Sequence, residues 1–146
     1  MKKILVAIEN CESTTISSPL MARVMELADA FSSKVWLLHV VRHEGSIPFN
    51  IDRELLRREA AAELHQEHES LQHLAQCLRD RDIDAKALLI EGATVDTIVE
   101  EVGRLGIDLI MLGCHRHGLL YNALMDPTEE GLLSKCVSPL LFVPLT

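Results

Sequence analysis

Five short, almost wholly apolar runs recur along the chain, and stretches with helical periodicity separate them. The runs are Lys3–Ile8, Val35–Val41, Ala85–Ile90, Ile107–Leu112 and Leu140–Val143. An apolar run of this length without polar alternation is typical of a strand that is covered on both faces. Strands that alternate with helices form a parallel sheet through right-handed crossovers. The sequence therefore predicts one α/β domain over residues 1–146, a three-layer open sheet of five parallel strands.

Apolar residues return every three or four positions between these runs, as in amphipathic helices. The first helical face is Ile16, Leu20, Val24, Leu27 and Phe31, with Ser17 or Ser18 as cap and Pro19 in the first turn. The longest runs from about Ile51 to Arg81, with a face of Leu56, Ala60, Leu64, His68, Leu71, Ala75 and Leu78, where His68 is expected at the edge of the core. Two shorter faces are Val95, Ile98, Val99 and Val102, and then Leu132, Leu133 and Cys136.

Charge and composition exclude several partners. The net charge is -8 and only 3% of residues are aromatic, so the chain offers neither a phosphate-binding basic patch nor base-stacking platforms for nucleic acid. No apolar run approaches the roughly 20 residues that cross a bilayer, and the start does not resemble a secretory signal, so we expect no membrane insertion and a cytoplasmic location. The four cysteines contain no C-x-x-C pair, which suits a reducing compartment.

Ligands of open parallel sheets bind beyond the carboxyl ends of the strands, near the point where the strand order reverses. This rule directs attention to residues 9–13, 42–49, 91–93 and 113–128. None of them contains a P-loop, a nucleophile elbow or an H-E-x-x-H motif. We assign no catalytic residue and no metal ligand, and the sequence favours binding or signalling over catalysis.

Several segments spaced along the chain together carry a resemblance to a known family: ILVAIEN, LLHVV, EGATVDTIVEEV, DLIMLGCHRHG and SPLLFVP. On these segments the chain resembles the universal stress protein family over essentially its whole length. The resemblance implies a Rossmann-like, adenine nucleotide alpha hydrolase-like fold with strand order 3-2-1-4-5. It also implies a stress-response protein that binds ATP or AMP, a protein partner or another small ligand. By the same resemblance, two subunits pair through the fifth strand, at Leu140, Leu141, Phe142 and Val143.

Nucleotide-binding members of that family hold the base with an Asp at the end of the first strand. They wrap the ribose and phosphates with a G-x2-G-x9-G-[ST] motif after the fourth. The corresponding positions here are Glu9 for the Asp, and Gly113, Arg116, Asp126 and Pro127 for the motif. Val40, His115 and Gly118 are further family-equivalent positions around the site. Only the first glycine of the motif is present.

These departures predict a degenerate site. Pro127 has no N–H to donate, and Asp126-Pro127-Thr128-Glu129 is typical of a helix start that caps itself with Asp126. We predict an Arg116–Asp126 ion pair that fills the phosphate position, so that ATP binds weakly or not at all. The alternative is that both side chains point to solvent without meeting. The rival hypothesis is a functional ATP or AMP site, with slow ATPase or adenylate-sensing activity, in which Arg116 contacts phosphate. The variant Arg116→Ala would open the site in the first case and abolish binding in the second.

Thiols and imidazoles offer two further hypotheses. Cys11 and Cys114 follow strands predicted to be neighbours, and with His115 they could form a redox pair, although two inert cysteines are favoured. His65, Glu69 and His73 share the spacing of a helical metal site, but a solvated helix face is the favoured interpretation. His115 and His117 lie in the cleft loop and are better placed to line a pocket.

Overall fold

The computed structural model describes residues 1–11, 14–41, 53–116 and 118–145. The strands are β1 (Lys3–Ile8), β2 (Lys34–Val41), β3 (Ala85–Glu91), β4 (Leu109–Cys114) and β5 (Leu140–Pro144). The helices are α1 (Pro19–Phe31), α2 (Arg53–Arg79), α3 (Thr94–Leu105), α4 (Leu119–Met125) and α5 (Leu132–Lys135). All strand pairs are parallel and the sheet order is β3-β2-β1-β4-β5, which confirms the expected fold class and strand order.

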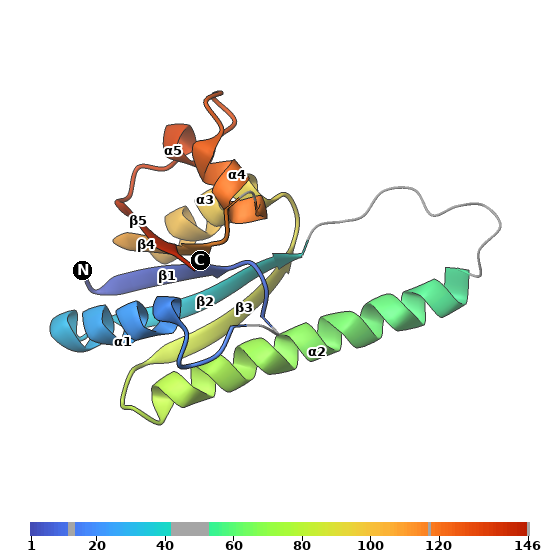
Figure 1. Cartoon of the computed structure of the whole chain (residues 1–146), viewed down its shortest axis with the longest axis horizontal. Coiled ribbons are helices and arrows are strands. Elements are labelled where there is room, and N and C mark those ends of the chain that lie inside the picture. The colour runs from blue at the N-terminus through green and yellow to red at the C-terminus, as the bar shows by residue number, and fades with distance from the viewer. Residues whose placement is uncertain (12–13, 42–52, 117, 146) are drawn as a thin grey trace.

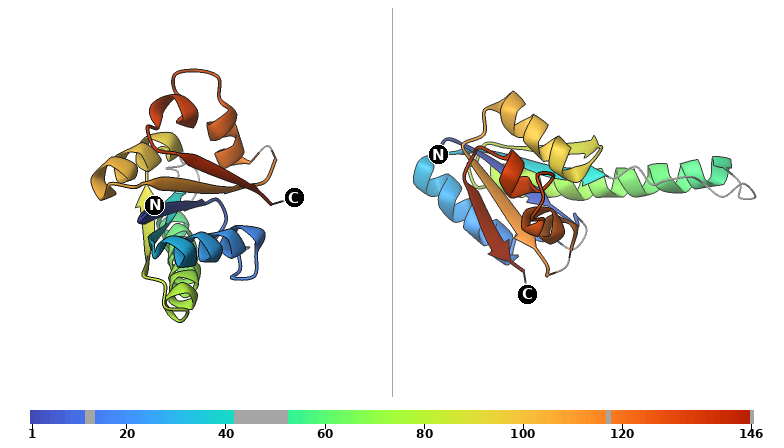
Figure 2. Two further views of the ribbon diagram at one scale, coloured as in Figure 1. Left: turned by 90° about the vertical axis from the view of Figure 1, so that its left-hand side faces the viewer. Right: turned by 90° about the horizontal axis from the view of Figure 1, so that it is seen from above.

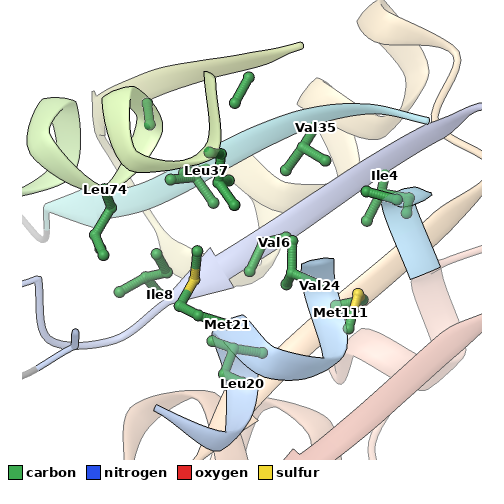
Figure 3. Close-up of a cluster of buried hydrophobic side chains, with 14 of the residues drawn as sticks. Ile4, Val6, Ile8, Leu20, Met21, Val24, Val35, Leu37, Leu74 and Met111 are labelled. Carbon is green, nitrogen blue, oxygen red and sulfur yellow. The ribbon is translucent and has the colours of Figure 1, made fainter. Parts of the chain in front are cut away.

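The sheet is covered on both faces, as the apolar runs predict. Figure 1 shows α1 and α2 on one side of the sheet and α3, α4 and α5 on the other, and Figure 2 shows the same layers from two further directions. Alternate side chains of β1 lie on opposite faces of the sheet. Ile4, Val6 and Ile8 belong to the core cluster with α1 and α2 (Figure 3), while Leu5 and Ala7 belong to the cluster with α3 and α4.

Capping residues explain where α1 and α3 begin and end. Ser18 is the N-cap of α1 and accepts a hydrogen bond from the Met21 N–H at 3.3 Å, with Pro19 in the first turn, which confirms the prediction. Gly106, with φ of 67°, ends α3 in the left-handed conformation. Asp108 then accepts from the backbone N–H groups of Lys2 and Lys3, each at 3.0 Å. These bonds align β4 beside β1.

The predicted buried stripe of α2 is correct only for its second half. Leu71, Leu74, Ala75 and Leu78 are buried in the first core cluster. His68 is exposed and lies 3.1 Å from the side chain of Gln72, so its predicted place at the core edge is wrong. The side chains of Leu56 and Ala60 lie outside the described part of the chain. The reason is that the first half of α2 runs past the end of the sheet, where no strand covers it (Figure 1).

The last part of the chain departs from the prediction most. A helix that the sequence analysis missed, α4, begins at Leu119, and Asp126 lies at its C-terminal cap. No helix begins at Pro127, since α5 begins only at Leu132 with Gly131 as its N-cap. The Asp126 side chain accepts hydrogen bonds from the N–H and the hydroxyl of Thr128, at 2.9 and 2.7 Å, and so forms a turn. The predicted self-capped helix start is therefore wrong.

No helix in the described ranges combines the length and the apolar composition that crossing a membrane requires.

Candidate functional site

The site lies where the strand order reverses, at the carboxyl ends of β1 and β4. Ile8 pairs with Gly113 in this part of the sheet, so the residues that follow the two strands begin side by side. A cavity of about 30 Å³ opens beside this point, at the carboxyl ends of β1 and β2. Its lining comes from β1, β2, α3 and α4 and consists of Ala7, Ile8, Glu9, Leu38, His39, Val40, Thr94, Ile98, Leu119 and Leu120. Open α/β sheets bind ligands at this position.

Glu9 is the acidic group of this cavity, and it is already engaged. Its Oε1 accepts a hydrogen bond from the backbone N–H of Leu119, the first residue of α4. Both carboxylate oxygens lie directly over Gly118, where a Cβ would come within 2.6 Å of each of them. A side chain at position 118 would therefore force the Glu9 carboxylate to move away from the start of α4. Glu9 joins the end of β1 to the start of α4 across the mouth of the cavity.

Cys114 is a buried thiol at the end of β4, and its pKa is raised. Cys114 ends β4, is 1% exposed and belongs to the core cluster on the α3–α4 face. Burial and, to a smaller extent, the charge of Glu9 together raise the pKa of its thiol to about 12. Cys11 belongs to the cluster on the opposite face of the sheet, and neither cysteine is in a disulfide. The two thiols are not brought together, so the hypothesis of a redox pair is not supported.

Gly113, the one residue that matches the family's phosphate motif, has a packing role. A Cβ on Gly113 would come within 2.5 Å of the Leu20 side chain on α1. The absence of a side chain thus allows α1 to pack closely against β4. Close packing alone accounts for a glycine here.

Val40 lines the cavity, as predicted, but the remaining predicted residues do not gather around it. His115 and Arg116 are exposed after β4, and His117 lies outside the described residues. Asp126 and Pro127 follow α4, about 10 Å from its start for a helix of seven residues. Arg116 forms no ion pair with Asp126 in the part of the chain that the structure describes. Asp126 instead accepts hydrogen bonds from Thr128, and these bonds lower its pKa. The predicted ion pair is therefore wrong.

The histidines of α2 pair within their own helix. His65 Nε2 lies 3.0 Å from Glu69 Oε1, and His73 Nε2 lies 3.7 Å from the Cys77 sulfur. No three His, Cys, Asp or Glu side chains lie close enough to hold a metal ion within the described ranges. Residues 12–13 and 42–49, which the sequence analysis also assigned to the site, lie outside the described residues.

Fold and site together define a Rossmann-like α/β protein with a ligand position at the switch point of its sheet. The sequence matches the Universal stress protein family over residues 1–144, and the chain belongs to this family. No curated protein matches the sequence.

Solved structures share the fold at low sequence identity. A protein of the universal stress protein family from Burkholderia pseudomallei is 19% identical with a TM-score of 0.69, over 98% of this chain and 96% of that one. A universal stress protein from Archaeoglobus fulgidus in complex with dAMP is 15% identical with a TM-score of 0.62, over 97% of both chains. A universal stress protein in complex with cAMP is 16% identical with a TM-score of 0.57, over 99% of this chain and 98% of that one.

Proposed function

We propose that this chain is a stress-response protein with a degenerate nucleotide site, which binds ATP weakly or not at all. The observation that carries the proposal is the hydrogen bond from the Leu119 N–H to Glu9, with both carboxylate oxygens over Gly118. A donor that already serves Glu9 is not free for a phosphate oxygen. The negative charge of Glu9 also repels a polyphosphate.

The size of the cavity supports the same conclusion. Its volume of about 30 Å³ compares with about 300–1,000 Å³ for typical small-molecule sites. A Glu carries one more methylene group than the Asp of nucleotide-binding relatives, and this length lets the carboxylate cross to α4. Two of the similar structures contain dAMP and cAMP, so adenine nucleotides are the ligands to test.

Shortening Glu9 is expected to open the site. Isothermal titration with ATP and AMP should detect no micromolar binding to the wild type. Glu9→Ala, which removes both bulk and charge, should bind at least about tenfold more tightly, equivalent to about 1.4 kcal/mol. Glu9→Gln keeps the length but loses the charge, so it separates repulsion from obstruction. Glu100→Ala removes an exposed acid of α3 and should behave as wild type. Micromolar ATP affinity in the wild type would refute the proposal.

Arg116 distinguishes the proposal from a functional ATP or AMP site. With no ion pair to Asp126 in the described residues, Arg116 does not close the degenerate site. Arg116→Ala should therefore leave the weak affinity of the wild type unchanged. If the wild type binds ATP and this variant does not, Arg116 contacts phosphate and the rival hypothesis is correct.

We also propose that the protein is a cytoplasmic homodimer that pairs through β5. This strand lies at an edge of the sheet, and an uncovered apolar edge strand favours association. Leu141 on β5 is 36% exposed and the nearby Val137 is 97% exposed. A second copy of β5 would cover this edge. A dimer built in this way leaves the opposite edge, β3, free for another protein partner.

Charge on β5 is expected to break the dimer. Leu141→Lys should shift the mass measured by light scattering from that of two chains to that of one, because two lysines would meet across the two-fold axis. Phe31→Lys places the same charge at an apolar residue that is 46% exposed at the end of α1, and this variant should remain dimeric. A wild type that is monomeric at all concentrations, or a Leu141→Lys variant that remains dimeric, would contradict pairing through β5.

A further inference from the structure

A histidine and a cysteine face each other on the solvent side of α2. The Nε2 atom of His73 lies 3.7 Å from the sulfur of Cys77, four positions further along the helix. His73 is exposed and Cys77 is partly exposed, so solvent reaches both side chains. The Cys77 thiol is free, and neither residue belongs to a core cluster. The pair does not line the cavity at the carboxyl ends of β1 and β2, and the proposed function leaves it unused.

The distance between the two atoms suits a metal ion that binds both of them. Bonds from Zn²⁺ are about 2.0–2.1 Å long to a histidine nitrogen and about 2.3 Å long to a cysteine sulfur. In a tetrahedral ion these bonds place the nitrogen and the sulfur about 3.6 Å apart. The observed 3.7 Å is close to this separation, so the two side chains need little movement to hold the ion.

The other histidines in the described part of α2 have different partners. His65 Nε2 lies 3.0 Å from Glu69 Oε1, closer than the roughly 3.4 Å between two such ligands of one tetrahedral ion. A carboxylate is also a harder ligand than a thiolate. His68 Nε2 lies 3.1 Å from the side-chain nitrogen of Gln72, and an amide nitrogen is not a usual metal ligand. Among the described side chains of α2, only the pair at 73 and 77 combines the donor types and the spacing that Zn²⁺ prefers.

The polar side chains beside the pair are bonded elsewhere. The side chain of Gln76 donates to Asp80 at 2.8 Å, and Arg81 donates to the backbone carbonyl oxygen of Cys77 at 3.0 Å. In the described ranges none of these three side chains is hydrogen-bonded to the thiol or to the ring of His73. The net charge of -8 attracts cations to the surface of the chain.

We propose that His73 and Cys77 form an exchangeable site for a borderline-soft divalent metal ion such as Zn²⁺, with water at the remaining positions. On binding, the thiol releases its proton to solvent and the sulfur gives an electron pair to the ion. The neutral ring of His73 gives the electron pair of Nε2, and no oxidation state changes. Two protein ligands replace the four of a structural zinc site, so the dissociation constant should be on the order of 10–100 µM. The site is independent of nucleotide binding.

Isothermal titration of the full, reduced chain with Zn²⁺ tests the site. Cys77→Ser and His73→Ala should each weaken Zn²⁺ binding at least about tenfold, because each leaves one protein ligand. His65→Ala and Cys136→Ser remove a histidine of the same helix and a partly exposed cysteine outside it, and both variants should bind as the wild type does. Mg²⁺ prefers oxygen ligands and should not compete.

Two further measurements report on the thiol itself. Cd²⁺ should produce the ultraviolet charge-transfer band of a metal thiolate in the wild type and not in Cys77→Ser. Zn²⁺ at about ten times its dissociation constant should slow alkylation of Cys77 about tenfold and leave that of Cys136 unchanged. In His73→Ala the same concentration should slow alkylation about twofold or less, because binding is weaker.

Three results would overturn the proposal. The first is a wild type that does not bind Zn²⁺. The second is a Cys77→Ser or His73→Ala variant that retains the affinity of the wild type, which would place the ion elsewhere. The third is loss of binding in His65→Ala, which would assign the ion to the first histidine of the described part of α2.

Discussion

Leu37→Ala is expected to lower the free energy of unfolding by about 2–5 kcal/mol. Leu37 lies in the middle of β2, is 0% exposed and belongs to the cluster between the sheet and α1 and α2 (Figure 3). It is flanked by Val6 on β1 and Ala87 on β3 in the parallel ladder. Since these strands are fixed by their own hydrogen bonds, the cavity left by the smaller side chain cannot collapse. The midpoint of urea unfolding, with an unchanged slope, measures the loss.

Leu133→Ala is the matched control for this substitution. Leu133 lies on α5 with 58% of its surface exposed, so the same truncation should change stability by less than about 0.5 kcal/mol. Both variants must be compared at one protein concentration, because a dimer gains apparent stability by mass action. Equal losses in the two variants would contradict the assignment of the core.

Alkylation of Cys114 is expected to be about 1,000-fold slower than that of an ordinary thiol. Its pKa is raised from 9.0 to about 12, chiefly by burial and further by Glu9. Three pH units correspond to a 1,000-fold smaller thiolate fraction at neutral pH, and the thiolate is the reactive form. The unfolded chain loses this proton from about pH 9 upward while the folded one retains it. Stability should therefore fall as pH rises above the ordinary pKa.

Peptide mass spectrometry after timed treatment with iodoacetamide measures this reactivity at each cysteine. Cys77 on α2 is partly exposed and serves as the internal comparison in the same sample. Unfolding in urea should bring the modification rates of the two cysteines together. If Cys114 is modified as fast as Cys77 in the folded protein, the thiol is not buried as described.

Most of the fold could be predicted because each strand of this sheet is covered on two sides. A strand such as β1, whose alternate residues enter different core clusters, must be apolar throughout, and this is visible in sequence. The start of β4 was predicted two residues too early, at Ile107. Gly106 ends α3, and the Asp108 side chain accepts hydrogen bonds from the backbone N–H groups of Lys2 and Lys3. Residues 106–108 therefore form a connection before the strand begins.

The region after β4 could not be predicted because local signals conflict there. The sequence Asp126-Pro127-Thr128 fits a helix start and a side-chain turn equally well, and the preceding helix decides between them. Leu120 and Leu124, which α4 buries, lie four positions apart. This spacing was a usable signal that the sequence analysis overlooked.

The central contact of the site depends on tertiary structure alone. Glu9 and Leu119 are 110 positions apart. Resemblance to the family implied only that Glu9 takes the place of the base-binding Asp, whereas the geometry reveals that its carboxylate reaches the α4 backbone. For the same reason the sequence predicted the obstruction at Arg116 and Asp126, whereas the contact between Glu9 and α4 leads us to propose it at Glu9.

The most direct test of the Glu9 obstruction is an amide NMR titration with ATP. In the wild type, the Gly118 and Leu119 resonances should not move at micromolar ATP, while in Glu9→Ala they should shift and saturate. Saturable micromolar shifts of these two amides in the wild type would mean that phosphate reaches the backbone past Glu9, which contradicts a degenerate site.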